Sequence, residues 1–237
     1  MKNSTKEIIN EINTYRDESK AAFLPRFFKT GKGEYGEGDQ FIGVVVPNLR
    51  IVAKKHFDAD FDTLRELLAS PYHEYRLTAL LALTYRYAKL KDHTSRETCV
   101  NFYVSQVDSI NNWDLVDLSC YKILGHWLFD KDKQLLYDWA KENHLWKQRI
   151  AMISCMHFVK QGEFKDALAI ADLLQHHPHD LIHKAVGWIL REIGKEDEQL
   201  LVDYLTPRYK EMPRTMLRYA IERFEEGKRK AFLNSTI

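Results

Sequence analysis

The sequence has little of several features that would place it in a specialised class of protein. Its 237 residues include three cysteines and no C-x-x-C pair, so we expect neither a disulfide framework nor a cysteine zinc site. No stretch approaches the roughly 20 apolar residues that a membrane-spanning helix needs, and the polar N-terminus has no apolar signal segment. With 35 basic and 34 acidic residues the net charge is only +1, which excludes a uniformly basic protein but not a basic face. We expect a soluble, cytoplasmic protein with no membrane partner.

The dominant pattern that remains is helical periodicity. Apolar residues recur at spacings of three and four along most of the chain, which has few glycines and prolines. Such stripes occur at 64–68, 77–85, 115–124, 150–159 and 186–193. The pattern predicts about a dozen helices, many in pairs of roughly 35–45 residues, the length of a HEAT-type repeat. Periodicity alone leaves a repeat solenoid and an irregular helical bundle open. No linker divides the chain, so we expect one domain over residues 1–237.

One segment, residues 30–46, does not follow the helical pattern. It is rich in glycine and ends in an apolar run. We expect a mobile loop that leads into a helix beginning at Pro47, because proline suits the first turn of a helix. The segment could be a plain surface loop, or it could contact a ligand through its backbone N–H groups and through Lys29 or Lys32.

Three motifs in the sequence suggest chemistry that we do not expect. Residues 31–36 read G-x-G-x-x-G, but a helical stretch and not a strand precedes them, and three nearby acidic residues would repel a pyrophosphate. The histidines within 176–179 stand between two expected helices without a carboxylate or cysteine at matching spacing, so solvated histidines are favoured over a metal site. Cys120 and Cys155 lie in apolar stretches and are expected to be small core residues.

The segment NNWDLVD at 111–117 is the first that points to chemistry. Asn111 or Asn112 can cap a helix. Trp113 and Asp117 are then four residues apart and share one helix face. A carboxylate beside an aromatic ring can stabilise a developing positive charge. The alternative is a core tryptophan with Asp117 paired to an arginine, since structural ion pairs are common.

Two later segments repeat the combination of tryptophan and arginine. Arg149 follows Trp146 by three residues, and Trp188 and Arg191 share a helix face. Gly187 beside Trp188 permits the close approach of another backbone or of a ligand. In a curved stack of helix pairs, matching positions line one concave surface. Arginine suits phosphate and tryptophan suits a sugar or base, so this surface would fit nucleic acid.

NNWDLVD, LWKQR (145–149) and above all KAVGWILRE (184–192) resemble the AlkD family of bacterial DNA glycosylases, in order from about residue 42 to about residue 225. The resemblance implies an all-α fold, a curved α-solenoid of HEAT-like helical repeats. It implies hydrolysis of the N-glycosidic bond of N3- or N7-alkylated purines in duplex DNA, without flipping of the base into a pocket, in base-excision repair. Neither a metal nor another cofactor is implied.

The resemblance also implies roles for individual residues. Asp117 matches the catalytic carboxylate, and Trp113 and Trp188 match the aromatics that pack against the deoxyribose of the lesion. Arg149 matches an arginine that holds the DNA backbone, and Arg191 would be a further backbone contact. To these we add two DNA-binding candidates from the glycine-rich segment, Lys29 and Lys32.

The N-terminal half departs from the family pattern at two places. Family members often carry two adjacent tryptophans before the aspartate, and here the first is Asn112. Val45 and Val46 stand before Pro47 where the best-known members have Gln-Thr. This element normally helps to grip DNA.

Three hypotheses for function follow. The leading one is an alkylpurine DNA glycosylase that acts on alkylated double-stranded DNA as a monomer, without an obligatory protein partner. The second is a catalytically silent DNA-binding protein of the same fold that recognises distorted or branched DNA. The third is a HEAT-like scaffold for protein interactions, which needs no cluster of this kind.

Overall fold

A computed structural model describes residues 4–237. By their contacts the residues form two compact units, Met1–Ile123 and Leu124–Ile237. Among the described residues no β-strand forms, and Gln40 and Tyr72 make the one isolated bridge. The predicted all-α fold is therefore confirmed. The single domain over 1–237 stays a prediction, and its first three residues lie outside the described part. No helix in the described range is long and apolar enough to span a membrane.

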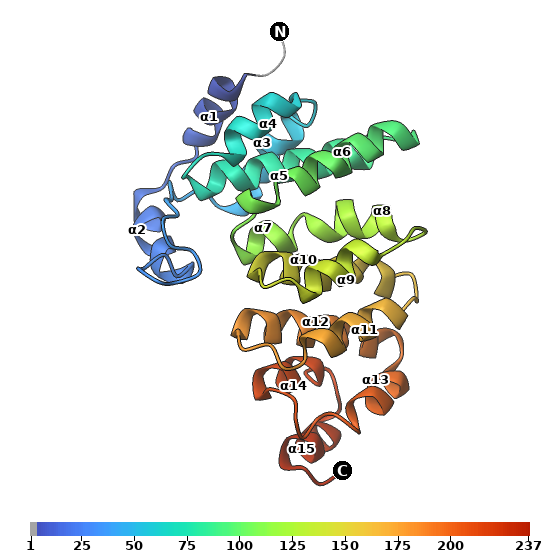
Figure 1. Cartoon of the computed structure of the whole chain (residues 1–237). Coiled ribbons are helices and arrows are strands. Elements are labelled where there is room, and N and C mark those ends of the chain that lie inside the picture. Colours follow the sequence, from blue (N-terminus) through green and yellow to red (C-terminus); the bar gives the residue numbers. More distant parts are fainter. Residues whose placement is uncertain (1–3) are drawn as a thin grey trace. The chain divides into compact units, whose positions relative to one another are not determined.

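Unit 1 is organised around one long, largely buried helix, α5, which contacts α3, α4, α6 and α7 (Figure 1). The helices of this unit are α1 (Thr5–Asn13), α2 (Glu18–Phe27), α3 (Val46–Lys55), α4 (Phe61–Leu68), α5 (His73–Lys89), α6 (His93–Ser105), the 3-10 turn η1 (Val107–Ser109) and α7 (Trp113–Asp117). α1 contacts α3 and α4. The apolar stripes predicted at 64–68 and 77–85 lie on α4 and α5, and their leucines are buried, as expected for core positions.

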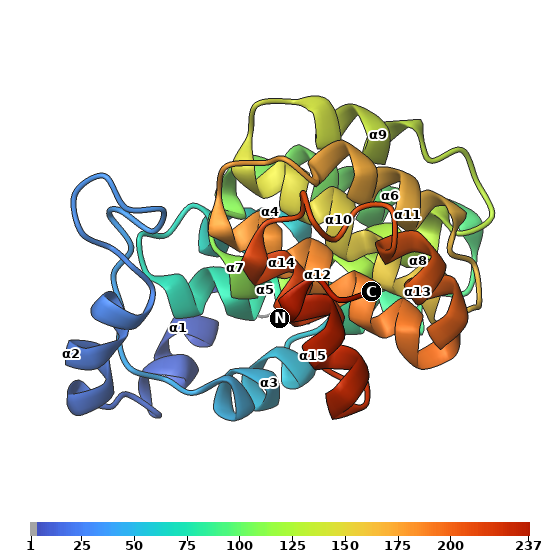
Figure 2. The same ribbon diagram turned by 90° about the horizontal axis from the view of Figure 1, so that it is seen from below.

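α2 and the glycine-rich segment after it form what we call the N-terminal lobe, residues 18–45. Figures 1 and 2 show it projecting from the other helices of unit 1. α2 itself buries no residue. As predicted, a helix precedes the glycine-rich stretch, and Pro47 lies in the first turn of the helix that follows, which begins at Val46. Because α2 has no core contacts of its own, the lobe depends on contacts at its ends.

Aspartate side chains begin many of the helices. Asp17, Asp60, Asp92 and Asp197 cap α2, α4, α6 and α13, and each carboxylate accepts a hydrogen bond from the backbone N–H three residues later. These bonds satisfy N–H groups that have no partner inside the helix. Several of the helices are only eight to ten residues long, which is marginal for an isolated helix, so capping and packing have to stabilise them.

The stripe predicted at 115–124 is not one continuous helix, which corrects the sequence analysis. α7 ends at Asp117, and a π-helical turn, η2 (Tyr121–Gly125), follows it. The Ser119 hydroxyl donates to the Leu115 carbonyl, the acceptor that the Ser119 amide would use in a regular helix. That amide bonds one residue closer along the chain. Such a bond between side chain and backbone weakens or bends a helix, and it lies where α7 gives way to η2.

Unit 2 is built from paired helices in two rows. α10, α12 and α14 contact one another in order, and α9, α11 and α13 pack against them. The helices are α8 (His126–Leu128), α9 (Gln134–Lys141), α10 (Leu145–Val159), α11 (Lys165–Leu174), α12 (Asp180–Glu196), α13 (Glu198–Leu205), α14 (Arg214–Ala220) and α15 (Glu226–Asn234). Pairing of α9 with α10 and of α11 with α12 is the arrangement that HEAT-like repeats predict. Cys155 is buried in α10, and Cys120 is buried in unit 1, both as expected of core residues.

Gly187 determines how closely two helices of unit 2 approach. A Cβ atom at this position would lie 2.5 Å from the Met216 carbonyl oxygen and 2.5 Å from the Tyr219 Cβ, both on α14. The predicted close approach at Gly187 is therefore made by a backbone, that of α14. Gly194, on the same helix, differs because its Cβ would meet the end of the flexible Leu201 side chain.

Replacement of Gly187 by alanine should therefore destabilise the protein, since the α14 backbone has to move. We expect Gly187→Ala to lose about 1–3 kcal/mol of unfolding free energy, measured by urea denaturation. Gly194→Ala is the matched control, because Leu201 can rotate and alanine favours a helix by about 1 kcal/mol over glycine. Equal stabilities of the two variants would contradict this account of the α12–α14 contact.

Candidate active site

Trp113 and Asp117 occupy the two ends of the short helix α7. The Asn112 side chain caps this helix by accepting a hydrogen bond from the Trp113 amide at 2.9 Å, as the sequence predicted for one of the two asparagines. Asn112 is fully buried, whereas Trp113 and Asp117 are each half-buried. Their spacing of four residues places the ring and the carboxylate on one face of the helix.

The surroundings of Asp117 favour a positive charge. Because α7 ends at this residue, the carboxylate lies at the carbonyl end of a helix, where the backbone dipoles add negative potential. Burial raises the pKa of the neighbouring Tyr103 well above its usual value, and the nearby Asp117 carboxylate raises it further. Tyr103 therefore stays neutral, and its hydroxyl is hydrogen-bonded to Ser119 at 3.1 Å.

Trp113 belongs to a cluster of aromatic rings from three parts of unit 1. Its indole stacks on Phe28, with ring centroids 5.4 Å apart and an angle of 19° between the planes, and it meets Phe27 edge-on at 6.0 Å. Phe28 also contacts Phe41 at 5.1 Å and the His73 ring at 4.7 Å. This cluster attaches the N-terminal lobe to the first turns of α5 and α7.

A buried group of charges lies beneath the aromatic cluster. His73 is held between two carboxylates, with Nε2 2.8 Å from Asp114 and Nδ1 3.2 Å from Asp39. Arg76 approaches the other oxygen of Asp39 at 2.7 Å. Burial lowers the pKa of His73, but the two carboxylates outweigh it and raise the pKa to about 9. Burial works against ionisation of Asp39 too, yet its two cationic partners lower its pKa. Two positive and two negative charges balance in this group, which we call the charge cluster.

A second carboxylate holds the end of the glycine-rich segment. Glu74 is buried and accepts hydrogen bonds from the backbone N–H groups of Ile42, Gly43 and Val44 at 2.8–3.3 Å. Gly43 has a φ of +84°, and a Cβ there would collide with the backbone of Asp17. Three neighbouring amides and a glycine are therefore needed to seat the segment on the start of α5.

Trp188, Arg149 and Arg191, the candidates in unit 2, lie on the contacting helices α10 and α12. Trp188 is half-buried. Arg149 is almost completely buried and donates a hydrogen bond to the Leu181 carbonyl, so it braces the first turn of α12. Arg191 is partly exposed and forms an ion pair with Glu222.

The histidines near the start of α12 contribute to the local backbone structure. His177 Nδ1 accepts from the amide of His179, and His179 Nδ1 accepts from the amide of Leu181 and so caps α12. Burial lowers the pKa of both rings. They are half-buried and not fully solvated as the sequence suggested. Across residues 4–237 no group of three or more histidine, cysteine or acidic side chains is arranged to hold a metal ion.

The predicted site residues thus form two groups. Trp113 and Asp117 share α7 in unit 1, and the exposed Lys29 and Lys32 lie on the N-terminal lobe of the same unit. The group around Trp188 belongs to unit 2. Contact of one DNA substrate with both groups is part of the proposal below.

The residues that support Trp113 were not predicted from the sequence. Phe27 and Phe28 form an adjacent aromatic pair before the glycine-rich segment. This pair was the visible signal in the sequence, because two neighbouring aromatic side chains need a surface to pack against. Asp39 and His73 are 34 residues apart in the sequence, and no local pattern indicates their contact.

Paired helices that carry a carboxylate and aromatic rings define this chain as a helical-repeat protein with a candidate site on α7. The family model described as "DNA alkylation repair enzyme" matches residues 8–224, and the chain belongs to this family.

Two solved structures have the same fold. A predicted DNA alkylation repair enzyme from Enterococcus faecalis is 14% identical, with a TM-score of 0.68, over 89% of this chain and 97% of that one. AlkD2 from Streptococcus mutans is 15% identical, with a TM-score of 0.55, over 88% of this chain and 99% of that one. No curated protein matches the sequence significantly.

The raised pKa of His73 gives stability a specific pH dependence. The folded state holds the proton more tightly than the unfolded chain, whose histidine pKa is near 6.5. Its contribution, on the order of 3 kcal/mol, is therefore complete below pH 6.5 and is lost as pH rises through 9. We expect the unfolding free energy of the native protein to exceed that of His73→Gln by much more at pH 6 than at pH 9.5.

Urea denaturation at the two pH values measures this difference. The control is His176→Gln, since His176 is exposed. The difference in unfolding free energy between the native protein and this control variant should be the same at both pH values. A constant gap between the native protein and His73→Gln would contradict a charged His73.

Proposed function

We propose that this member of the DNA alkylation repair family is a DNA glycosylase that excises N3- or N7-alkylated purines from duplex DNA. The lesion is not flipped into a protein pocket. The observation that carries the proposal is the half-buried Asp117 carboxylate at the end of α7, on one face with Trp113. Excision leaves a free base and an abasic site, so its place is in base-excision repair.

The chemistry of such lesions suits one carboxylate. A purine alkylated at N3 or N7 is already a cation, so it departs with the electron pair of the C1′–N bond and needs no general acid. The sugar left behind approaches an oxocarbenium ion, as in glycoside hydrolysis. Water then adds to C1′ and releases a proton to solvent.

Asp117 would stabilise the positive charge on the sugar and orient the attacking water. The charge on the sugar grows as the bond breaks, so a fixed carboxylate favours the transition state over the ground state. The position of Asp117 at the carbonyl end of α7 strengthens this preference, because the helix dipole there has the same sign.

The aromatic rings would hold the lesion nucleotide. Trp113 and Trp188 pack against its deoxyribose, and each face adds cation–π stabilisation on the order of 0.5–2 kcal/mol. Phe27 and Phe28 fix the plane of the Trp113 ring through the contacts described above.

Basic side chains would hold the DNA backbone. Arg191, Lys29 and Lys32 are at least partly exposed and can reach phosphates. Arg149 acts from a buried position and orients the start of α12 toward the backbone. The proposal needs no cofactor and no protein partner, and we expect a cytoplasmic monomer.

Release of free base tests the proposal. Duplex DNA with a single N7-methylguanine is incubated with the native protein under single-turnover conditions, and the free base is quantified by chromatography. We expect release by the native protein and a loss of at least about a hundredfold in rate for Asp117→Asn, with duplex binding retained because the amide keeps the shape of the carboxylate.

Asp130→Asn is the matched control, since Asp130 is an exposed aspartate, and it should keep the native rate. Failure of the native protein to release base, or full activity of Asp117→Asn, would refute the assignment.

A further inference from the structure

α2 exposes two large aromatic side chains side by side. Phe23 is 60% exposed and Phe27 is 51% exposed. Their rings are stacked, with centroids 6.2 Å apart and 28° between the planes. Because the helix buries no residue, these rings are not needed for a core of its own. An exposed aromatic pair of this kind is a candidate contact surface.

The exposed pair is continuous with the candidate active site. Phe27 contacts the Trp113 indole edge-on at 6.0 Å, and Trp113 stacks on Phe28. Phe23, Phe27 and Trp113 therefore form a row of rings that runs from the surface of the lobe to the helix that carries Asp117. Phe28 is buried and fixes the inner end of the row.

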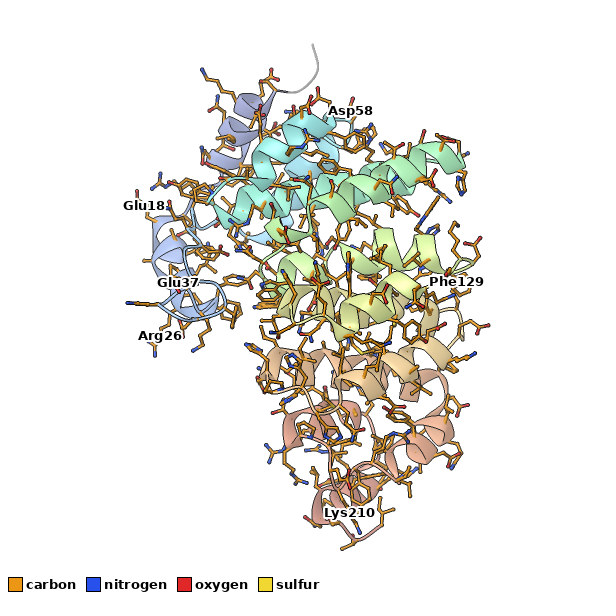
Figure 3. The ribbon with its side chains drawn as sticks, in the orientation of Figure 1. Glu18, Arg26, Glu37, Asp58, Phe129 and Lys210 are labelled. Atoms are coloured by element: carbon orange, nitrogen blue, oxygen red, sulfur yellow. The ribbon has the colours of Figure 1, made fainter. Side chains whose placement is uncertain are left out.

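Three exposed cations belong to the same lobe as the exposed rings. Arg26, Lys29 and Lys32 are exposed, and none of their side chains makes an ion pair or a hydrogen bond with another described residue. Figure 3 labels Arg26 on the outer side of the N-terminal lobe. Other basic side chains of the described residues, such as Lys55 and Arg208, form ion pairs with neighbouring carboxylates. The three cations of the lobe are therefore available for an external anion.

Two acidic residues of the glycine-rich segment bond to the backbone of that segment. Glu34 accepts a hydrogen bond from the Gly31 amide at 2.8 Å, and Glu37 accepts one from the Gly33 amide at 2.7 Å. Asp39 is buried in the charge cluster. The Glu34 and Glu37 carboxylates thus shape the loop and form no ion pair with the three cations.

We propose that the Phe23–Phe27 pair, with Arg26, Lys29 and Lys32, is a binding site for unpaired nucleobases of DNA. Stacked aromatic faces accept any base, and adjacent cations hold the phosphates, which is how proteins bind single strands without sequence preference. The inference rests on the proposed function in taking DNA as the ligand. Next to a lesion, the site would hold a base that has lost its pairing partner.

Binding of a single strand tests the site. The probe is a fluorescein-labelled dodecamer of deoxythymidine, and binding to the full-length protein is followed by anisotropy. We expect the double variant Phe23→Ala/Phe27→Ala to bind at least about tenfold more weakly than the native protein. Both side chains are exposed, so the variant should fold, and circular dichroism checks this. Leu173→Ala, which removes an exposed apolar side chain of α11, should bind as the native protein does.

The salt dependence tests the cations separately. A plot of log affinity against log salt has a negative slope, and each phosphate contact that is lost makes this slope less steep by about 0.7 for a single strand. We expect Arg26→Gln/Lys32→Gln to reduce the magnitude of the slope by about 1.4.

Three results would overturn the inference. The first is no binding of the dodecamer by the native protein, and the second is equal binding by Phe23→Ala/Phe27→Ala and Leu173→Ala. The third comes from a parallel measurement with anionic phospholipid vesicles: the double variant loses binding to the vesicles but keeps its binding to DNA. The same preparations are assayed for N7-methylguanine release from paired duplex. If the native protein releases N7-methylguanine but the double variant binds the dodecamer normally, only the site on the lobe is refuted. If the double variant binds the dodecamer more weakly but the native protein releases no base, only the glycosylase activity is refuted.

Discussion

The balance of charge beneath Trp113 is the constraint on which the rest of unit 1 depends. His73 lies between Asp39 and Asp114 with almost no access to water. Each of these carboxylates would be costly to bury alone, because a buried charge without a partner loses its hydration and gains nothing. One of them comes from the glycine-rich segment and the other from α7. The cluster therefore fixes the position of the N-terminal lobe relative to the helix that carries Asp117.

The same constraint explains how a lobe without a core of its own remains in place. α2 contributes no buried side chain, so Phe28, Asp39 and the three amides bound by Glu74 hold the lobe. Because the lobe is attached at only a few points, the outer face of α2 packs against no other helix of the described residues. That face can then carry exposed phenylalanines and unpaired cations, which a helix packed on both sides could not display.

The break after Asp117 is the second feature that gives α7 its character. A regular helix through residues 115–124 would bury Asp117 in the middle of a helix, where the backbone dipoles cancel. α7 instead ends at Asp117, and the Ser119 hydroxyl donates to the Leu115 carbonyl just beyond this end. The end of the helix thus places the Asp117 carboxylate beside the last carbonyl groups of α7, whose negative potential favours a cation.

Local features of the fold could be predicted from the sequence, and contacts between distant residues could not. The two asparagines before an apolar stripe predicted the start of α7, where Asn112 is the cap, and Gly187 predicted the close approach of a backbone or a ligand, which is made by α14. The end of α7 was missed because periodicity records side-chain spacing and not the competition of a hydroxyl for a carbonyl. The charge cluster was missed because it joins a loop to two helix starts. Trp113 and Asp117 were predicted as a pair, and they do share α7. Their catalytic role stays a prediction.

The central claim is that a fixed carboxylate, without a general acid, removes bases that are already cationic. The most direct measurement compares two duplexes that differ only in the charge of one base, N7-methylguanine in one and neutral hypoxanthine in the other. The account predicts release of N7-methylguanine at least about a hundredfold faster than release of hypoxanthine, because the neutral base leaves only when it is protonated. Comparable rates for the two bases would contradict it.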